Sequence, residues 1–88
     1  MNRAESIKIG EKSMTLKNLI ELYRLCRSAQ HQLYICTKKT MCKIKDLLEL
    51  EMFRMSNREK ECLIVIEGKE AETLIRKAKS IVYQTNVQ

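Results

Sequence analysis

Hydrophobic residues that recur every three or four positions predict a long amphipathic helix over residues 13–30. One face of this helix is apolar, and further hydrophobic residues widen it beyond a single buried stripe. Ser13 and Thr15 are both favourable N-caps, so the helix start offers backbone N–H groups to an anion. The face and its widened edge comprise Leu19, Leu22, Cys26 and Ala29, then Leu16, Ile20 and Tyr23.

Two further helices are predicted downstream. Asp46 begins a short helix over residues 46–53, because Asp is a good N-cap and Glu49, three residues later, completes a capping box. Residues 71–82 carry a clear helical stripe of apolar residues. Acidic residues come first in this last helix and basic residues later, as the helix dipole favours.

Alternation of hydrophobic and polar residues predicts strands, and the apolar run CLIVI predicts a central one. Residues 38–39 form the reversal between the second and third strands, and residues 67–68 turn the chain before the last helix. Residues 85–88 are expected to fray. The strands are predicted over residues 5–9, 33–37, 40–45 and 62–66.

The predicted order of elements is β-α-β-β-α-β-α, which indicates a single α+β domain over residues 1–88. Each helix has one apolar stripe to bury, and an antiparallel sheet has one face that needs a cover. We therefore expect a four-stranded antiparallel sheet covered by three helices on one face. A chain of this length buries roughly 60–70% of its unfolded surface, which suffices for one core but not for a deep cavity.

Charge is distributed unevenly along the chain. The net charge is +6, and residues 1–45 hold ten Lys and Arg against three Glu, whereas residues 46–88 hold seven basic and eight acidic residues. A positive half favours a protein partner with an acidic or phosphorylated surface, or nucleic acid. No apolar run approaches the ~20 residues of a membrane span. Residues 1–10 lack the apolar segment of a secretion signal, so we expect a cytoplasmic protein with no membrane association.

Candidate catalytic and metal-binding residues are few. His31 is the sole histidine, and no carboxylate or cysteine stands in a sequence relation that would orient it. We therefore expect no metal, no cofactor, no small-molecule substrate and no enzymatic activity. The four cysteines match no zinc-binding spacing and are interpreted as buried free thiols: Cys26, Cys36, Cys42 and Cys62.

The order, length and spacing of these elements resemble the histidine-containing phosphocarrier protein (HPr) family of the bacterial sugar phosphotransferase system, together with its histidine-less catabolite-repression paralogue. The segment KIKDLLELEMF resembles the family's Lys-Ser-hydrophobic-hydrophobic helix start. The segment CLIVIEGKEAETLIRKA resembles its last strand, Gly-containing turn and last helix. The resemblance implies the family's open-faced β-sandwich.

The family's defining sequence, Gly-Leu/Ile-His-x-Arg-Pro-Ala, corresponds here to residues 13–19. Thr15 replaces the phosphate-accepting histidine, or Leu16 does so if the match shifts by one residue. Lys17 replaces the arginine and Asn18 the proline. Relay of phosphate from phosphoenolpyruvate in this family depends on a nitrogen nucleophile that forms a labile phosphoramidate. A threonine ester is too stable and leucine has no nucleophile, so the resemblance implies that the relay is lost.

Asp46 occupies the position of the family's regulatory serine, which an ATP-dependent kinase phosphorylates. Two interpretations stay open. Asp46 is a fixed negative charge that resembles the phosphorylated state, or it is simply an N-cap, a role in which Asp and Ser are interchangeable. Asp carries less charge and fewer oxygens than a phosphate group.

The family binds its partners through the first two helices, and the resemblance implies the same surface here. Its leucines and isoleucine are surplus to one buried stripe, and its basic residues follow an exposed ridge, as an interface for an acidic partner does. Glu51 departs from the apolar residue usual in the family. The alternative, in which these leucines all belong to the core, stays open. Carried over position by position, the surface comprises Thr15, Leu16, Lys17, Ile20, Arg24, Arg27, Leu47, Leu48 and Glu51.

Three functions therefore compete. The first is a non-catalytic HPr-like adaptor or regulator that binds a protein partner. The second is a basic nucleic-acid-binding α/β domain, against which the single Phe and three scattered Tyr count. The third is a phosphocarrier with an unexpected acceptor, Thr15 or His31. The second would use four lysines of the hairpin: Lys38, Lys39, Lys43 and Lys45.

Overall fold

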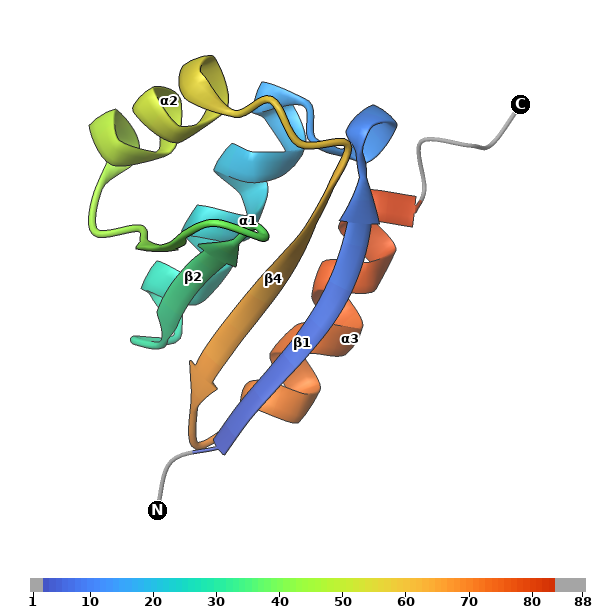
Figure 1. Ribbon diagram of the computed structural model, residues 1–88. Helices are drawn as coiled ribbons and strands as arrows, with labels where there is room; N and C mark the ends of the chain where they lie inside the picture. The colour runs from blue at the N-terminus through green and yellow to red at the C-terminus, as the bar shows by residue number, and fades with distance from the viewer. Residues whose placement is uncertain (1–2, 84–88) are drawn as a thin grey trace.

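A computed structural model describes residues 3–83 and confirms the predicted order of strands and helices (Figure 1). The expected fraying of residues 85–88 lies outside the described residues. A single turn of 3-10 helix (Glu11–Ser13) precedes the first α-helix. The remaining elements are β1 (Arg3–Gly10), α1 (Leu16–Ser28), β2 (Gln32–Cys36), β3 (Met41–Lys43), α2 (Leu47–Ser56), β4 (Glu61–Gly68) and α3 (Ala71–Tyr83).

The four strands form one antiparallel sheet in the order β1-β4-β2-β3. The apolar run in β4 is central, as predicted, because Ile64 pairs with Ile7 of β1 on one side and with Ile35 of β2 on the other. All three side chains are buried. Alternation along each strand sends one set of side chains to the helices and the other to the opposite face.

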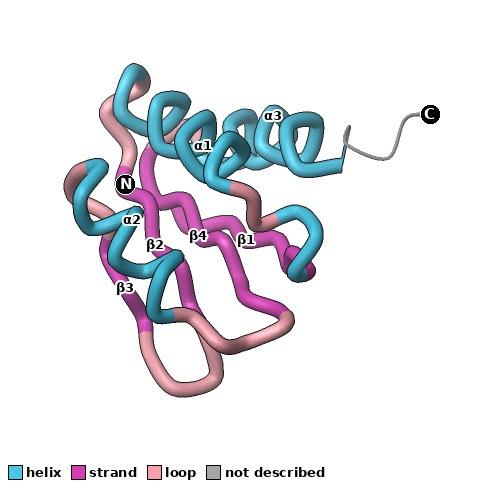
Figure 2. Tube along the Cα trace, turned by 90° about the horizontal axis from the view of Figure 1, so that it is seen from above, coloured by secondary structure: helices cyan, strands magenta, loops and turns pink. Residues whose placement is uncertain are grey.

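All three helices contribute to one core over the same face of this sheet, and Figure 2 shows α1 and α3 side by side along it. Leu19, Leu22 and Cys26 bury the inner face of α1. Leu50 and Phe53 bury that of α2. The molecule is therefore the open-faced β-sandwich with four strands and three helices that the sequence resemblance implies.

Several predicted boundaries are wrong in informative ways. α1 begins at Leu16 rather than at residue 13, because Ser13 closes the 3-10 turn and its hydroxyl donates to the carbonyl of Val82 (3.0 Å). α2 continues to Ser56, beyond the predicted end at residue 53. Gly68 is the last residue of β4 and not part of the turn, which follows it.

The hairpin between β2 and β3 reverses at Lys38 and Lys39, as predicted, although β3 is shorter than expected. The Thr37 hydroxyl accepts hydrogen bonds from the backbone N–H groups of Lys39 (3.2 Å) and Thr40 (3.1 Å). This side-chain turn explains how the reversal forms without Gly or Asn. Gln30 is the one non-glycine residue with positive φ in residues 3–83, so neither lysine is strained.

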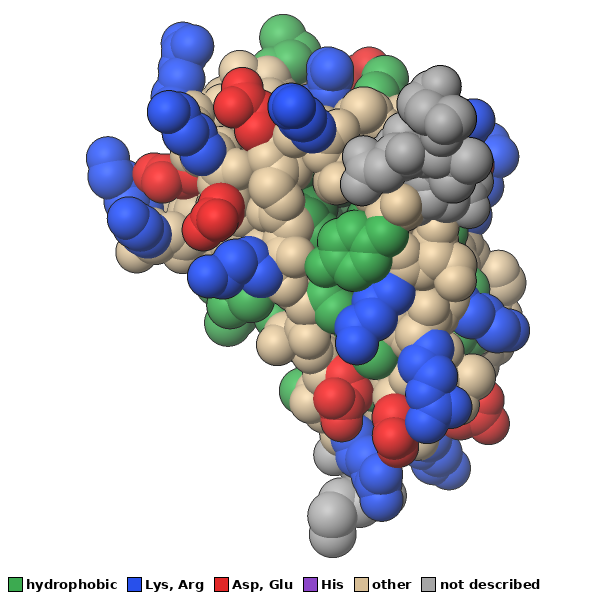
Figure 3. Space-filling view, turned by 90° about the vertical axis from the view of Figure 1, so that its right-hand side faces the viewer, with side chains coloured by type: hydrophobic (Ala, Val, Ile, Leu, Met, Phe, Trp, Pro, Cys, Tyr) green, Lys and Arg blue, Asp and Glu red, His purple; other side chains and the backbone are tan. Residues whose placement is uncertain are grey.

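The side of the molecule formed by β1 and α3 carries charges of both signs, with Lys and Arg in excess. Figure 3 shows Lys and Arg interspersed with Asp and Glu around a small hydrophobic patch. Lys8 of β1 pairs with Glu61 of β4 (3.8 Å), and Glu72 of α3 pairs with Arg76 (3.2 Å) and Arg3 (3.8 Å). These exposed pairs contribute little to stability.

Candidate functional site

The start of α1 is capped by Thr15, the residue that the resemblance places at the phosphate-accepting position. Thr15 has extended backbone angles, and its hydroxyl oxygen accepts a hydrogen bond from the backbone N–H of Asn18 (3.1 Å). Leu16 is the first residue inside the helix and is half-buried. The polar side chain at the head of α1 is therefore Thr15, and its oxygen already satisfies one of the free N–H groups of the helix.

Asn18 is buried, although the sequence predicts no role for it beyond replacing the family's proline. It is 4% exposed, and its side-chain amide donates to the carbonyl of Ser13 (3.0 Å). This bond ties the first turn of α1 to the segment that enters it. Nothing in the helical pattern marks the burial, because an isolated Asn between hydrophobic residues is equally common on a surface. Lys17 is exposed beside it.

The start of α2 is the N-cap that the sequence predicts. The Asp46 carboxylate accepts a hydrogen bond from the backbone N–H of Glu49 (2.9 Å). The Glu49 carboxylate accepts a hydrogen bond from the backbone N–H of Lys45 (2.9 Å). In a standard capping box it would accept from the N-cap residue itself, which is Asp46. The N-cap role of Asp46 is therefore confirmed, and its likeness to a phosphoserine stays a prediction.

The candidate partner-binding surface is the outer side of α1 and α2, two helices that contact each other. Leu47 is 46% exposed and Leu48 is 66% exposed, so the alternative in which all the leucines belong to the core is wrong. Leu16 and Ile20 are half-buried, and Ile20 packs against the core. The charged members are all exposed: Lys17, Arg24, Arg27 and Glu51.

Exposed apolar residues extend further along α2 than the predicted surface does. Met52 is 58% exposed and Met55 is 76% exposed, and they follow Leu48 at spacings of four and seven residues. These three residues form a second stripe on the side of α2 away from Leu50 and Phe53. The spacing was visible in the sequence, and a search for two apolar stripes on one helix would have found it.

His31 lies at the opposite end of α1 from Thr15 and is held on both ring nitrogens. Nδ1 lies 2.8 Å from the carbonyl oxygen of Ala29, and Nε2 accepts a hydrogen bond from the backbone N–H of Glu70 (2.9 Å). This pattern fits the neutral ring with its proton on Nδ1. The ring also packs so closely on Gly68 that a Cβ there would lie 2.2 Å from His31 Cδ2. The histidine therefore bridges the α1–β2 and β4–α3 connections.

The four cysteines are free thiols, and Cys26 and Cys62 are buried as predicted. Cys36 and Cys42 are half-buried, so the prediction of a buried thiol is wrong for these two. Burial raises the pKa of the Cys26 thiol to about 12, and burial and then the neighbouring Cys36 raise that of Cys62 to about 11. Burial also raises the pKa of Cys36 and, with a contribution from Glu49, that of Cys42. A raised pKa keeps each thiol protonated and unreactive at neutral pH. Within residues 3–83, no group of three or more His, Cys, Asp or Glu side chains could hold a metal ion.

The four lysines of the nucleic-acid alternative are exposed on or next to the hairpin: Lys38, Lys39, Lys43 and Lys45. The three tyrosines lie on three different elements, α1, β2 and α3. Tyr34, on β2, donates its hydroxyl proton to Glu67 (3.1 Å). In the described part of the chain, adjacent strands therefore carry no pair of aromatic rings on which bases would stack. No helix among residues 3–83 is long and apolar enough to cross a membrane.

The sequence of this chain is similar to that of a bacterial protein. No family model matches the sequence. No solved structure matches it. The chain is 51% identical over 82 residues to the uncharacterized protein YwjC of Bacillus subtilis (strain 168), and the match covers 93% of this chain and 91% of that protein. The chain therefore belongs to the family of Bacillus subtilis YwjC.

Proposed function

We propose that this protein is a non-catalytic HPr-like adaptor or regulator that binds a protein partner through α1 and α2. The observation that carries the proposal is the exposure of Leu47 (46%) and Leu48 (66%) at the start of α2, next to a helix whose outer ridge is basic. Leucines at this exposure cost free energy in water, and a partner that covers them recovers it. A cytoplasmic location is part of the proposal.

The chemistry at the head of α1 supports a binding role rather than phosphate relay. Thr15 accepts a hydrogen bond as the N-cap, and a phosphothreonine ester is too stable to pass its phosphoryl group on. The nitrogens of His31 are occupied by Ala29 and Glu70 at the other end of the helix. We therefore propose that this protein does not accept phosphate for transfer within the phosphotransferase system.

The charge of the surface defines the partner that we propose. Lys17, Arg24 and Arg27 are exposed on α1, and none of them forms an ion pair with a carboxylate of residues 3–83. Unpaired cations around an apolar patch favour a partner whose own surface is acidic or phosphorylated. Glu51 interrupts the apolar side of the patch, and it would select against the partners of typical family members.

The test is affinity capture from the native host with two pairs of variants. Leu48→Asp and Arg24→Glu change the proposed surface, whereas Met41→Asp and Lys77→Glu place the same charges elsewhere. Met41 is 68% exposed, close to the 66% of Leu48, and Lys77 is exposed on α3. We expect one partner that the wild type and both controls retain and that both surface variants lose. A partner retained equally by all variants would overturn the proposed surface.

A further inference from the structure

The edges of a sheet present unpaired N–H and C=O groups, on which a strand of another protein can pair. The two edge strands here are β1 and β3. At the β1 edge, the Tyr83 hydroxyl of α3 donates to the carbonyl of Lys8 (3.1 Å), so α3 already occupies part of that edge. The β3 edge lies on the other side of the sheet, next to α2 (Figure 2).

Two residues of β3 offer free backbone groups at this edge. Ile44, directly after β3, bonds to β2 through its N–H, which donates to the carbonyl of Leu33 (2.9 Å). The alternation along an antiparallel strand then turns the backbone groups of Cys42 toward β2 and those of Met41 and Lys43 outward. Each of these two residues offers one N–H and one C=O to a strand added at the edge.

A groove of about 590 Å³ lies between the β3 edge and α2. Three exposed methionines line it: Met41 from β3, and Met52 and Met55 from α2. Cys42 and Phe53 complete its apolar lining. Methionine is flexible and polarizable, so a lining of this kind adapts to apolar side chains of different shapes.

The groove lies on a different side of α2 from the proposed partner surface. Glu49, Met52 and Ser56 line it at helical spacing, whereas Leu47 and Leu48 do not. Among residues 3–83, Glu49 is the one acidic residue that lines the groove, and its carboxylate repels other anions there. The groove therefore favours apolar side chains and selects against acidic ones.

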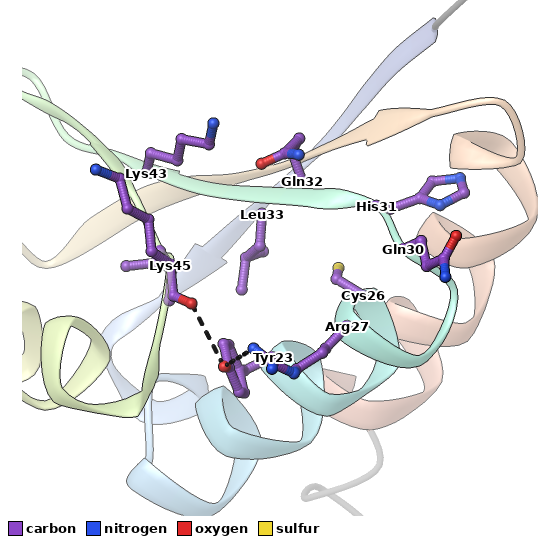
Figure 4. A pocket seen from close by; sticks show the side chains of 10 residues that line it. Tyr23, Cys26, Arg27, Gln30, His31, Gln32, Leu33, Lys43 and Lys45 are labelled. Atoms are coloured by element: carbon purple, nitrogen blue, oxygen red, sulfur yellow. Dashed lines mark hydrogen bonds between the residues drawn. The ribbon is translucent and has the colours of Figure 1, made fainter.

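The outer side of the β3 edge is cationic. Lys43 extends from the face of the sheet opposite α1 (Figure 4), and Lys38 and Lys39 are exposed at the reversal before β3. Within the described part of the chain, none of these three lysines forms an ion pair. Side chains of an added strand alternate between the two faces of the sheet, so one set enters the groove and the other lies beside Lys43. Charge complementarity favours acidic residues in that second set.

We propose that the β3 edge binds an extended segment of a partner protein in which apolar residues alternate with acidic ones. The main chain of this segment pairs with Met41 and Lys43. Its apolar side chains enter the groove beside Cys42 and Met52, and its acidic side chains face Lys43. The sequence alone does not predict this site, because β3 becomes an edge only when β2 pairs with β4.

The test is a titration of the full chain with the synthetic peptide Glu-Val-Glu-Leu-Glu-Val-Glu at physiological ionic strength, followed by fluorescence anisotropy and by amide hydrogen exchange. We expect saturable binding and slower exchange of the Met41 and Lys43 N–H groups. The N–H of Cys42 already faces β2, so its exchange should change little. The peptide Glu-Glu-Val-Leu-Val-Glu-Glu has the same composition without the alternation, and it should bind at least about tenfold more weakly.

Proline substitutions separate the two edges. Lys43→Pro removes an outward N–H without breaking a bond to β2, so it should weaken binding about tenfold. Lys43→Gln removes the charge alone and should weaken it less. Ser6→Pro is the matched control, because Ser6 lies two residues from Lys8 on β1 and also faces outward, and it should leave the affinity unchanged. Met52→Asp places a charge in the groove and should weaken binding about tenfold or more.

Two results would overturn the proposal: a titration that does not saturate, or a Ser6→Pro variant that loses as much affinity as Lys43→Pro does. Circular dichroism excludes unfolding as the cause, and Met52→Asp carries the test if Lys43→Pro fails to fold. The proposal is independent of the partner surface on α1 and α2. In the affinity capture, a partner of the β3 edge would be lost with Met41→Asp and retained with Leu48→Asp, the reverse of the pattern expected for that surface.

Discussion

The two ends of α1 are held by different kinds of contact. At the N-terminal end, the helix is capped by its own neighbours in sequence, through the Thr15 hydroxyl and the Asn18 amide. At the C-terminal end, His31 bonds across the molecule to Glu70 and packs on Gly68. Thr15, Asn18 and His31 therefore each already form a hydrogen bond with the backbone. The N-terminal end of α1 thus has a local cap, whereas its C-terminal end is held by a contact between two connections that are distant in sequence.

The largest expected effect is at the C-terminal end. Gly68→Ala should lower the free energy of unfolding by about 2–4 kcal/mol, because the added Cβ would meet the His31 ring at 2.2 Å and Gly68 has a φ of 159°. Urea denaturation measures the loss. In the double variant Gly68→Ala/His31→Ala the steric part should disappear, so the two substitutions should be strongly non-additive. A Gly68→Ala protein as stable as the wild type would contradict the close packing of the His31 ring on Gly68.

The next effect is at the N-terminal end. Asn18→Ala should lower the free energy of unfolding by about 1–3 kcal/mol, because it removes the bond to the Ser13 carbonyl at a site that is 4% exposed. Lys17→Ala, a change at the exposed neighbouring residue, is the control and should change it by less than about 0.5 kcal/mol. Urea denaturation measures both losses of unfolding free energy. Equal losses for the two variants would mean that the hydrogen bond from Asn18 to Ser13 does not stabilise the fold.

A pH dependence is expected from the thiol beneath the C-terminal half of α1. The Cys26 pKa is raised from 9.0 to about 12 by burial, so the unfolded chain loses this proton first as the pH rises. Through this thiol, the folded state should therefore keep its full stability below pH 9 and lose at most about 1.4 kcal/mol per pH unit above it, and the buried Cys62 thiol adds to the loss. Denaturation at pH 8, 9 and 10 measures the slope. Cys26→Ala should have a shallower slope, and identical slopes would refute this origin.

The smallest expected effect is an increase in the free energy of unfolding rather than a decrease. Gln30 has a φ of 60° at the turn that ends α1, where its N–H and that of His31 close back on the last helical carbonyls. Glycine adopts this conformation without strain, so Gln30→Gly should raise the free energy of unfolding by about 0.5–1 kcal/mol. Thermal denaturation should show a higher midpoint. A lower midpoint would mean that the Gln30 side chain contributes contacts that outweigh the backbone strain.

The sequence predicted the fold well because the periodic segments carry it. The apolar run in β4 is buried only as a central strand, and the apolar stripe in α3 is buried only as one face of a helix. The structure contains both elements. The contacts that define the two ends of α1 were harder to predict. The burial of Asn18 and the packing of His31 on Gly68 depend on segments that meet only in the folded chain, and His31 and Gly68 are far apart in sequence.

The candidate surface was predicted only in part, for a reason that is visible in α2. Leu50 and Phe53 satisfy the core, so Leu47, Leu48, Met52 and Met55 are left with large exposed fractions. A helix with apolar residues on two sides has no single pattern from which its buried side can be read. Which leucines face outward was therefore settled by the packing against α1 and the sheet.

Loss of the phosphate relay is tested by the intact mass of the protein after incubation with phosphoenolpyruvate and the first enzyme of the phosphotransferase system. A histidine-containing phosphocarrier protein in the same mixture serves as the positive control. We expect the control to gain a phosphoryl group and this chain to gain none. A phosphoryl group on Thr15 or His31 would contradict this expectation.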